Sequence, residues 1–318
     1  MAAIGRDILK ASKLLKTGNI VAIPTETVYG LAGNALRDDI VVKIFKAKNR
    51  PAFDPLICHT DSIDKIRQYV EYIPEEVVTL ASAFWPGPLT VLLKKKPIVP
   101  SLTTSGLEEV AFRIPNHPLT LELLSTLDFP LAAPSANPFG YISPTTAKHV
   151  QDQLGNEIPY ILDGGECEVG IESTIIGFPE GQPTVYRLGG KQVEEIEALI
   201  GLVQINLNQS SNPSAPGMMK SHYAPKKPVL VGNIARLIDA NRDKRIGILS
   251  FVDRYPEVAA EHQTVLSQNS DLNEAARNLF GALRKLDGLQ IDMILSEPFP
   301  DKGLGRAIND RLNRASAK

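Results

Sequence analysis

Residues 19–31, NIVAIPTETVYGL, join a short apolar run to a cluster of polar side chains. The apolar run at 19–24 is typical of a buried β-strand. The cluster at 24–31 begins where that strand ends, and it offers four polar side chains in five positions: Thr25, Glu26, Thr27 and Tyr29. Because open α/β sheets bind ligands at the carboxyl ends of their strands, this cluster is a candidate binding site. A polar turn ended by Gly30 is the alternative, and spacing alone leaves it open.

Outward from this stretch, helical and extended patterns alternate along the chain. Apolar residues recur every three to four positions and predict helices at 7–16, 38–47, 62–70, from 74, 118–127, 144–154 and 192–200. Short apolar runs predict strands at 55–59, 88–93, 109–114, 130–133, 159–163, 171–177 and 183–188. Several strands follow one another with only turns between them, so we expect an α/β fold on a twisted sheet of mixed direction.

The composition changes at 204–228, which is rich in Ser, Asn, Pro and Gly and has no apolar periodicity. Such a stretch is typical of a linker, and one this long is usually functional or disordered. Strands are expected beyond it at 229–231, 245–251 and 291–295, and helices at 272–286 and 304–314. We therefore expect a large α/β domain at 1–205, a linker at 206–227 and a small Rossmann-like α/β domain at 228–318.

The composition excludes several classes of protein. The 318 residues carry 34 basic and 36 acidic side chains, a net charge of −2, which does not suit a general nucleic-acid binder. The two cysteines, Cys58 and Cys167, exclude a disulfide framework and a four-cysteine zinc site, and they suit a reducing cytoplasm. No run of about 18 apolar residues is present, so we expect no membrane span and a cytoplasmic protein.

The second polar cluster is KAKNRPAFDPLICH, residues 46–59. Lys46, Lys48 and Arg50 form a short cationic run, and two prolines restrict the chain after it. Guanidinium and ammonium groups pair with phosphate oxygens, so this run suits a polyphosphate ligand. A solvated basic end of a helix is the alternative, because the helix dipole also favours cations there.

The third cluster is APSANPFGYISPT, residues 133–145, and it contains no charge. Ser135, Asn137 and Ser143 offer hydroxyl and amide groups, and the segment leads into a helix whose N-terminus favours an anion. A proline-rich turn system with Ser and Thr caps is the alternative.

Two arginines, Arg113 and Arg187, end apolar strands, where a buried guanidinium requires an anion. The five histidines, His59 among them, show no close pair with metal-ligand spacing. The chain contains no GxxxxGK[ST] phosphate loop and no GxSxG nucleophile turn. From the residues alone we expect a site for a small anion or nucleotide at the strand ends of the larger domain.

Together these motifs resemble the Sua5/YrdC/YwlC family, and specifically its two-domain Sua5 type of threonylcarbamoyl-AMP synthase. PTETVYGL, KxRP followed by PLICH, APSAN and the EST–I–I stretch occur in the family's order, and SAPGMMKSHYAP in the linker is characteristic of the Sua5 type. The resemblance covers essentially the whole chain and implies a YrdC-like large domain. It also implies that L-threonine, bicarbonate and ATP give L-threonylcarbamoyladenylate and pyrophosphate. Downstream tRNA threonylcarbamoyltransferase proteins would use this product to make t6A at tRNA position 37.

The resemblance also implies roles for individual residues. The catalytic set maps onto Lys48, Arg50, Ser135 and Asn137. Threonine contacts map onto Thr27, His59, Arg113, Ala133 and Ser173, and ATP contacts onto Arg50, Asp54, Ser135, Ser143, Arg187 and Tyr223. Mg²⁺ is expected with ATP, and the linker is expected to act as a lid that closes Tyr223 over the nucleotide. Asp54 replaces an asparagine that is common in the family, and its carboxylate would repel a triphosphate unless Mg²⁺ or a basic neighbour offsets it.

Two alternatives come from other classes of function. The first is weak RNA binding through Lys43, Lys46, Lys48, Arg50 and Lys94–Lys96, although few aromatic residues lie among them to stack on bases. The second is a carbamoyl-transfer enzyme that resembles hydrogenase maturation factors. Those proteins carry zinc-finger and acylphosphatase segments that this sequence lacks.

Overall fold

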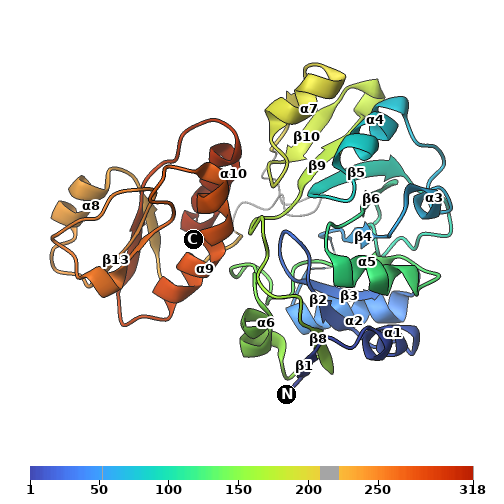
Figure 1. Ribbon diagram of the computed structural model, residues 1–318, viewed down its shortest axis with the longest axis horizontal. Helices are drawn as coiled ribbons and strands as arrows, with labels where there is room; N and C mark the ends of the chain where they lie inside the picture. The colour runs from blue at the N-terminus through green and yellow to red at the C-terminus, as the bar shows by residue number, and fades with distance from the viewer. Residues whose placement is uncertain (52, 208–221, 318) are drawn as a thin grey trace.

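The computed structural model describes residues 1–51, 53–207 and 222–317. Over these residues the chain forms two separate β-sheets, one with eleven strands and one with four, each flanked by helices (Figure 1). The larger sheet contains parallel and antiparallel pairs, and all pairs of the smaller sheet are parallel. The predicted α/β class, with a large mixed sheet and a small Rossmann-like unit, is confirmed.

The strands of the larger sheet are short. Their bounds are β1 Ala3–Gly5, β2 Val21–Ile23, β3 Gly30–Asn34, β4 Ile57–His59, β5 Leu89–Lys94, β6 Glu109–Arg113, β7 Leu131–Ala132, β8 Tyr160–Leu162, β9 Thr174–Gly177, β10 Thr184–Arg187 and β11 Gln204–Ile205. They lie in the order β1-β8-β2-β3-β7-β4-β6-β5-β9-β10-β11. Strands β4 and β6 are therefore neighbours, and the loops after them reach the same edge of the sheet.

The helices of this domain lie where the apolar periodicity predicts them, but the helix predicted at 62–70 is shorter than expected. They are α1 Ile8–Lys16, α2 Asp38–Lys48, α3 Ile63–Ile66, α4 Glu75–Phe84, α5 Pro118–Ser125, α6 Ala147–Leu154 and α7 Val193–Ile200, with a 3₁₀ turn at Pro179–Gly181. Helix α2 begins with two aspartates, which the helix dipole favours, and it ends at Asn49 in the left-handed conformation (φ 52°). This ending turns the chain sharply between Lys48 and Arg50.

Strand β3, Gly30–Asn34, was not predicted, because its sequence GLAGN has no strand-forming pattern. It pairs antiparallel with β2 and β7 and thereby joins the first polar cluster to the sheet. A Cβ atom at Gly33 would lie 2.7 Å from Cγ2 of Ile40 on α2. The glycine therefore allows α2 to pack closely on this strand.

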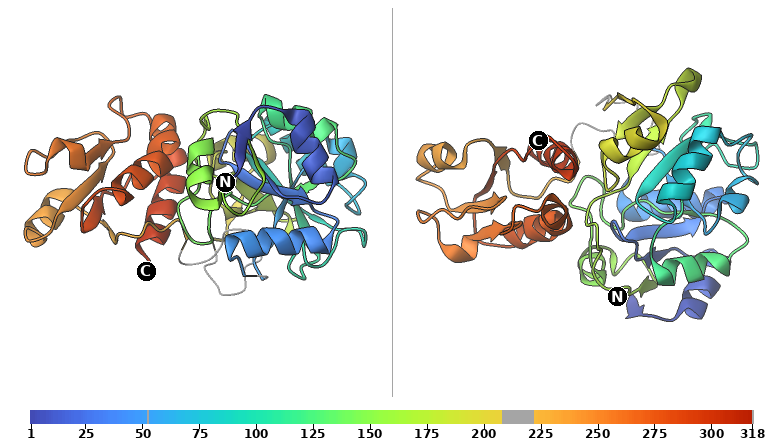
Figure 2. Two further views of the ribbon diagram at one scale, coloured as in Figure 1. Left: turned by 90° about the horizontal axis from the view of Figure 1, so that it is seen from below. Right: turned by 45° about the horizontal axis from the view of Figure 1, so that its top comes forward.

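The smaller sheet contains β12 Val229–Val231, β13 Ile246–Ser250, β14 Gln263–Val265 and β15 Met293–Ser296, in the order β12-β15-β13-β14. Its helices are α8 Ile234–Ala240, α9 Leu272–Asp287 and α10 Leu304–Ser316, with a 3₁₀ turn at Ala260–His262. Helices α9 and α10 face the larger domain, and α8 lies on the other side of the sheet (Figures 1 and 2). Helix α8 and strands β1 and β14 are short elements that the periodicity analysis did not predict.

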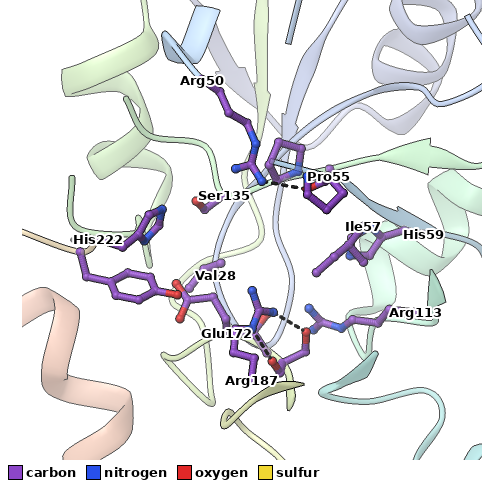
Figure 3. A pocket seen from close by; sticks show the side chains of 15 residues that line it. Val28, Arg50, Pro55, Ile57, His59, Arg113, Ser135, Glu172, Arg187 and His222 are labelled. Atoms are coloured by element: carbon purple, nitrogen blue, oxygen red, sulfur yellow. Dashed lines mark hydrogen bonds between the residues drawn. The ribbon is translucent and has the colours of Figure 1, made fainter. Parts of the chain in front are cut away.

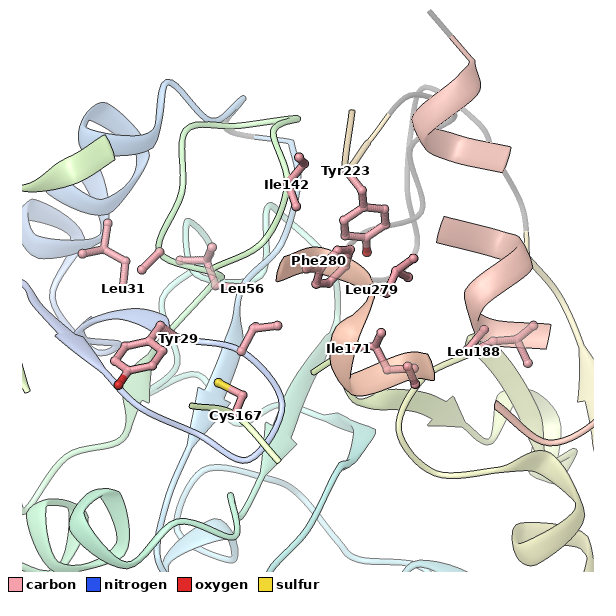
Figure 4. Close-up of a cluster of buried hydrophobic side chains, with 14 of the residues drawn as sticks. Tyr29, Leu31, Leu56, Ile142, Cys167, Ile171, Leu188, Tyr223, Leu279 and Phe280 are labelled. Atoms are coloured by element: carbon pink, nitrogen blue, oxygen red, sulfur yellow. The ribbon is translucent and has the colours of Figure 1, made fainter. Parts of the chain in front are cut away.

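The two domains share one hydrophobic core. A single cluster of buried residues includes Leu31 and Ile171 of the larger domain and Leu279 and Phe280 of α9 (Figure 4). The ring of Tyr223 stacks on Phe280 with 5.6 Å between centroids. Gly170 has φ of +75°, and a Cβ atom there would lie 2.4 Å from the Cα atom of Arg277 on α9. This glycine therefore lets the backbone of the larger domain approach α9 directly.

Most of the expected linker, 206–227, falls outside the described residues. The part that is described ends at residue 207 and resumes at His222 and Tyr223. The lid therefore remains a prediction. No helix within the described ranges is long and apolar enough to cross a membrane. Cys58 and Cys167 are both free and buried.

Candidate active site

A pocket opens at the strand ends of the larger sheet, beside the small domain (Figure 3). It encloses about 520 Å³ of space between protein atoms, some of it open to solvent. The pocket is lined by Thr27, Val28, Arg50, Pro55, Ile57, His59, Arg113, Ala133, Pro134, Ser135, Glu172, Ser173, Arg187, His222 and Tyr223.

The first polar cluster is a tightly bonded turn at the end of β2. The Thr25 hydroxyl accepts hydrogen bonds from the backbone N–H groups of Thr27 and Val28 at 3.1 and 3.2 Å, and it donates to the Val28 carbonyl at 2.7 Å. This local bonding explains why a threonine stands here. The turn directs Thr27 into the pocket, whereas Tyr29 points away from it and donates to the Gly165 carbonyl. The predicted cluster is therefore both a turn and part of the site.

The cations of the second cluster lie on either side of the left-handed end of α2. Lys48 is the last helical residue and is buried, and its ammonium group donates to the carbonyl oxygens of Ser135 and Asn137. Burial, and then the nearby Arg50, lowers the pKa of Lys48 well below its usual value. In this structure Lys48 fixes the loop of the third cluster and does not line the pocket.

Arg50 does line the pocket, and its neighbour Asp54 offsets its charge. Its guanidinium donates to the carbonyl oxygens of Asp54 and Pro55, at 3.1 and 2.9 Å. It also forms an ion pair with the Asp54 carboxylate at 2.9 Å, and the side chains are 6% and 0% exposed. Arg50 is therefore the basic neighbour that offsets the Asp54 carboxylate, as the sequence analysis expected of Mg²⁺ or a basic residue.

The third cluster lies against the first. The Leu31 N–H donates to the Pro134 carbonyl, and the Ala136 N–H donates to the Tyr29 carbonyl. These bonds bring Ala133 and Ser135 into the lining of the same pocket as Thr27. The Asn137 amide lies deeper in the protein and donates to the carbonyl oxygens of Pro138 and Tyr141. Asn137 therefore shapes this loop and does not line the pocket.

His59 and Arg113 end the paired strands β4 and β6, and the strand register places them opposite each other. Burial, and then the charge of Arg113, lowers the pKa of His59 to about 3, so the imidazole is neutral at neutral pH. The Arg113 guanidinium donates to the Gly87 carbonyl at 3.2 Å and forms an ion pair with Glu26 at 2.7 Å. The buried arginine thus has its anion, as predicted, but this anion is a carboxylate of the protein.

Arg187 ends β10 and is held against the neighbouring strand β9. Its guanidinium donates to the carbonyl and hydroxyl oxygens of Ser173, both at 3.0 Å. The Ser173 hydroxyl also lies 2.7 Å from that of Thr90. Burial lowers the pKa of Arg187 to about 10, so it remains charged at neutral pH. Arg50 approaches the pocket from one side, and Arg113 and Arg187 approach from the other (Figure 3).

The small domain contacts the site through Glu172, a pocket residue of the larger domain. The Arg311 guanidinium of α10 donates to the Glu172 carboxylate at 3.0 Å, and the Ser143 hydroxyl donates to the other oxygen at 2.5 Å. Arg311 also lies over the ring of Tyr223, with 5.0 Å between its guanidinium carbon and the ring centroid. His222 is buried beside Tyr223, and burial lowers its pKa well below the usual value.

The structure therefore brings most of the predicted site residues to one cavity. Nine of them line it: Thr27, Arg50, His59, Arg113, Ala133, Ser135, Ser173, Arg187 and Tyr223. Four lie buried around it without lining it: Lys48, Asp54, Asn137 and Ser143. The sequence assigned no site role to Glu172 or Arg311, and His222 entered only as part of the linker motif SAPGMMKSHYAP. Glu172 lies beside Ser173 in a motif that was singled out, whereas nothing in the sequence of α10 marks Arg311.

Two cations of the RNA-binding alternative, Lys48 and Arg50, are withdrawn from the outer surface. Lys48 is buried, Arg50 faces the pocket, Lys43 donates to the Gly18 carbonyl and Lys94 pairs with Glu71. Within the described part of the chain, no three His, Cys, Asp or Glu side chains come together to hold a metal ion.

An α/β fold with three arginines at the walls of one pocket suits an enzyme that binds anionic small molecules. A family model for Sua5, YciO and YrdC proteins, described as "Telomere recombination", matches residues 13–189. A second model, described as the C-terminal domain of threonylcarbamoyl-AMP synthase, matches residues 192–317. The chain belongs to the Sua5 family of two-domain threonylcarbamoyl-AMP synthases, enzymes of the t6A tRNA-modification pathway.

Individual relatives agree over nearly the whole length. The threonylcarbamoyl-AMP synthase of Pyrococcus abyssi is 41% identical over 321 residues, covering 96% of this chain and 93% of the relative. The enzyme of Bacillus subtilis is 40% identical, covering 97% and 92%. The crystal structure of P. abyssi Sua5 complexed with L-threonine superposes with a TM-score of 0.93 at 39% identity, covering 99% of this chain and 97% of that one. Escherichia coli YciO, 19% identical with a TM-score of 0.52, shares the fold over 59% of this chain.

Proposed function

We propose that the pocket joins L-threonine, bicarbonate and ATP to give L-threonylcarbamoyladenylate, pyrophosphate and water. One observation carries this proposal: Arg50, Arg113 and Arg187 converge on a single buried cavity that also presents hydroxyl groups and a neutral imidazole. A triphosphate and a carbamate are both anions, so an enzyme that brings them together must offset their charges in one place.

The threonine end of the pocket lies between Thr27, His59, Arg113, Ala133 and Ser173. Arg113 would pair with the α-carboxylate, and its rigid strand end suits a bidentate contact. The neutral His59 would accept a hydrogen bond from the amine or the side-chain hydroxyl, since its pKa of about 3 leaves the ring unprotonated. The complex of the P. abyssi protein with L-threonine supports a threonine site in this fold.

The nucleotide end lies toward Arg50, Ser135, Arg187 and Tyr223. Arg50 and Arg187 would pair with phosphate oxygens, and the ring of Tyr223 would lie against the nucleotide. Lys48 and Asn137 would act indirectly by holding the Ser135 loop, whose backbone Lys48 already bonds. Asp54 and Ser143 would act through Arg50 and Glu172, the groups that they contact here.

In the reaction, the neutral threonine amine adds to the carbon of bicarbonate, and an amine proton leaves with the bicarbonate hydroxyl as water, which gives the carbamate. An oxygen of the resulting carbamate then attacks the α-phosphorus of ATP, and pyrophosphate leaves. This sequence requires no protein nucleophile. Positioning and charge stabilisation by the arginines supply the catalysis.

We expect Mg²⁺ to enter as part of the ATP complex, where it offsets charge on the phosphates. The product would be consumed by tRNA threonylcarbamoyltransferase proteins at position 37 of tRNA. A cytoplasmic location is expected from this use and from the two free cysteines.

Product analysis with the purified protein tests the proposal. Labelled bicarbonate should appear in a compound with the mass of threonylcarbamoyl-AMP, with one pyrophosphate released per molecule, and only when threonine and ATP are both present. ATP cleavage to ADP, or label incorporation without ATP, would contradict it.

A further inference from the structure

The carboxylate of Glu26 lies beside the threonine end of the pocket, and the proposed reaction gives it no role. Its carboxylate is 4% exposed and forms an ion pair with Arg113, with 2.7 Å from Oε2 to the guanidinium. Among the described residues, no hydrogen bond reaches either of its oxygens. Glu26 does not itself line the pocket, whereas Arg113 does. The carboxylate therefore acts on a ligand through its charge and through Arg113, without lining the pocket itself.

The backbone holds Glu26 in this position. The Thr25 hydroxyl closes the turn around it by accepting from Thr27 and Val28, and the Val169 N–H donates to the Glu26 carbonyl at 2.7 Å. On the other side, the Gly87 carbonyl accepts from Nε of Arg113 at 3.2 Å. The guanidinium is therefore held at two points, and its remaining N–H groups are left for a ligand.

A buried ion pair of this kind changes what the arginine attracts. A lone buried guanidinium draws in any small anion, because burial of an unpaired charge is costly. The proposed reaction supplies several anions at once, namely bicarbonate, ATP and pyrophosphate. When Glu26 offsets the charge of Arg113, an anion without a positive group gains little binding free energy. Its attraction to the arginine is opposed by repulsion from the carboxylate.

The same ion pair favours the binding of a zwitterion, which carries both a negative and a positive group. The α-carboxylate of an amino acid is attracted by Arg113 and its α-ammonium by Glu26, so the two charges of the pair match the two charges of the ligand. We infer that Glu26 is a positioning and specificity-determining residue: it orients Arg113 and makes the threonine end select an amino acid over a simple carboxylate. This inference rests on the proposed function, because it takes threonine as the ligand of Arg113.

The test compares threonine with 3-hydroxybutyrate, which keeps the carboxylate and hydroxyl groups but lacks the amine. We measure KM for threonine, KM for ATP and the inhibition constant of 3-hydroxybutyrate in the wild type and in Glu26→Gln. In the variant, threonine KM should rise and the inhibition constant should fall, shifting their ratio by about tenfold or more, while ATP KM stays unchanged. A purely structural role would not move this ratio.

Asp54→Asn is the matched control, because it also removes a buried carboxylate from an arginine of the same pocket. It should leave the ratio of threonine to 3-hydroxybutyrate unchanged. A double-mutant cycle with Arg113→Met tests the coupling of the two charges: the change in discrimination caused by Glu26→Gln should differ between the wild-type and Arg113→Met backgrounds. Independent, multiplying effects would overturn the inference.

A folded, active Glu26→Gln variant with the wild-type ratio would also overturn it. Should that variant not fold, the ratio is measured in Glu26→Asp, whose shorter side chain predicts a smaller shift in the same direction, and no shift there would overturn the inference. If the wild type makes no threonylcarbamoyl-AMP, the proposed function fails instead, and the two failures are thereby distinguished.

Discussion

Glu172 of the larger domain and Arg311 of the small domain meet in a buried ion pair, with 3.0 Å between Oε2 and Nε. The Arg311 side chain is 0% exposed, and that of Glu172 is 8% exposed. Because Glu172 also lines the pocket and accepts a hydrogen bond from Ser143, this pair connects the small domain to the site. The small domain is thus part of the structure that shapes the pocket wall.

Removing one partner of this pair should be far more costly than removing both. Arg311→Met leaves the carboxylates of Glu172 and Asp310 buried without it, and we expect a loss of about 3–5 kcal/mol in the free energy of unfolding. The double variant Glu172→Gln/Arg311→Met should recover part of that loss. Urea denaturation measures both.

The exposed pair of Arg242 with Asp239 provides the control for this prediction. Arg242→Met should leave the stability nearly unchanged, since both side chains are largely in solvent. Equal losses in Arg242→Met and Arg311→Met would show that burial of the domain contact does not matter.

Gly170→Ala should weaken the contact between the domains. The new Cβ atom would lie 2.4 Å from the Cα atom of Arg277, and the residue would keep a φ of +75° that alanine disfavours. Gly165→Ala is matched, because it has φ of +84° but no atom within 4 Å of its Cβ position. Gly165→Ala should cost about 1–2 kcal/mol from the backbone alone, and Gly170→Ala clearly more. Equal melting temperatures for the two variants would contradict the close approach.

Asp54→Asn should lower KM for ATP by about three- to tenfold, because the highly charged triphosphate is no longer repelled by a nearby buried carboxylate and Arg50 is released from its ion pair. The threonine KM should not change. The variant should also be less stable, since the buried Arg50 loses its counter-charge. Steady-state kinetics at saturating threonine measures the effect, with Asp64→Asn at an exposed ion pair as the control. A folded variant with an equal or higher ATP KM would refute this account of Asp54.

Buried His59 should make the protein sensitive to acid. Burial lowers its pKa from 6.5 to about 3, so between these values the unfolded chain binds a proton that the folded protein excludes. The stability that the neutral ring allows is therefore present above about pH 6.5 and is lost as the pH falls toward 3, by at most about 1.4 kcal/mol per pH unit. His59→Asn should flatten the curve of unfolding free energy between pH 7 and 4.5, measured by urea denaturation. Parallel curves for the variant and the wild type would contradict the shift.

Much of the fold can be predicted from local sequence patterns, where those patterns agree with the packing of the folded protein. Helix α2, Asp38–Lys48, matches its periodicity because its acidic start and apolar stripe agree. Strand β3 shows no such local pattern, because its Gly33 is explained only by the approach of Ile40, a residue of another element. A pattern that depends on a tertiary neighbour leaves no local signal.

The same distinction holds for the site. Motifs at strand ends predicted a small-anion site near Thr27, Arg113 and Arg187, since strand ends converge at one edge of a sheet, and the family resemblance added His59 to it. The partners of the arginines could not be predicted, because Glu26 meets Arg113, and Arg311 meets Glu172, only after chain segments far apart in sequence have packed. Likewise, only the packed structure shows that Lys48 bonds the backbone of the Ser135 loop.

The central claim is that one pocket lets a threonine carbamate meet ATP. Exchange of labelled pyrophosphate into ATP tests it most directly, because exchange requires reversible attack on the α-phosphorus within the site. We expect exchange only when threonine and bicarbonate are both present, and none in bicarbonate-depleted buffer. Exchange with ATP alone, or with threonine in the absence of bicarbonate, would show that the carbamate is not the attacking group and would contradict the account.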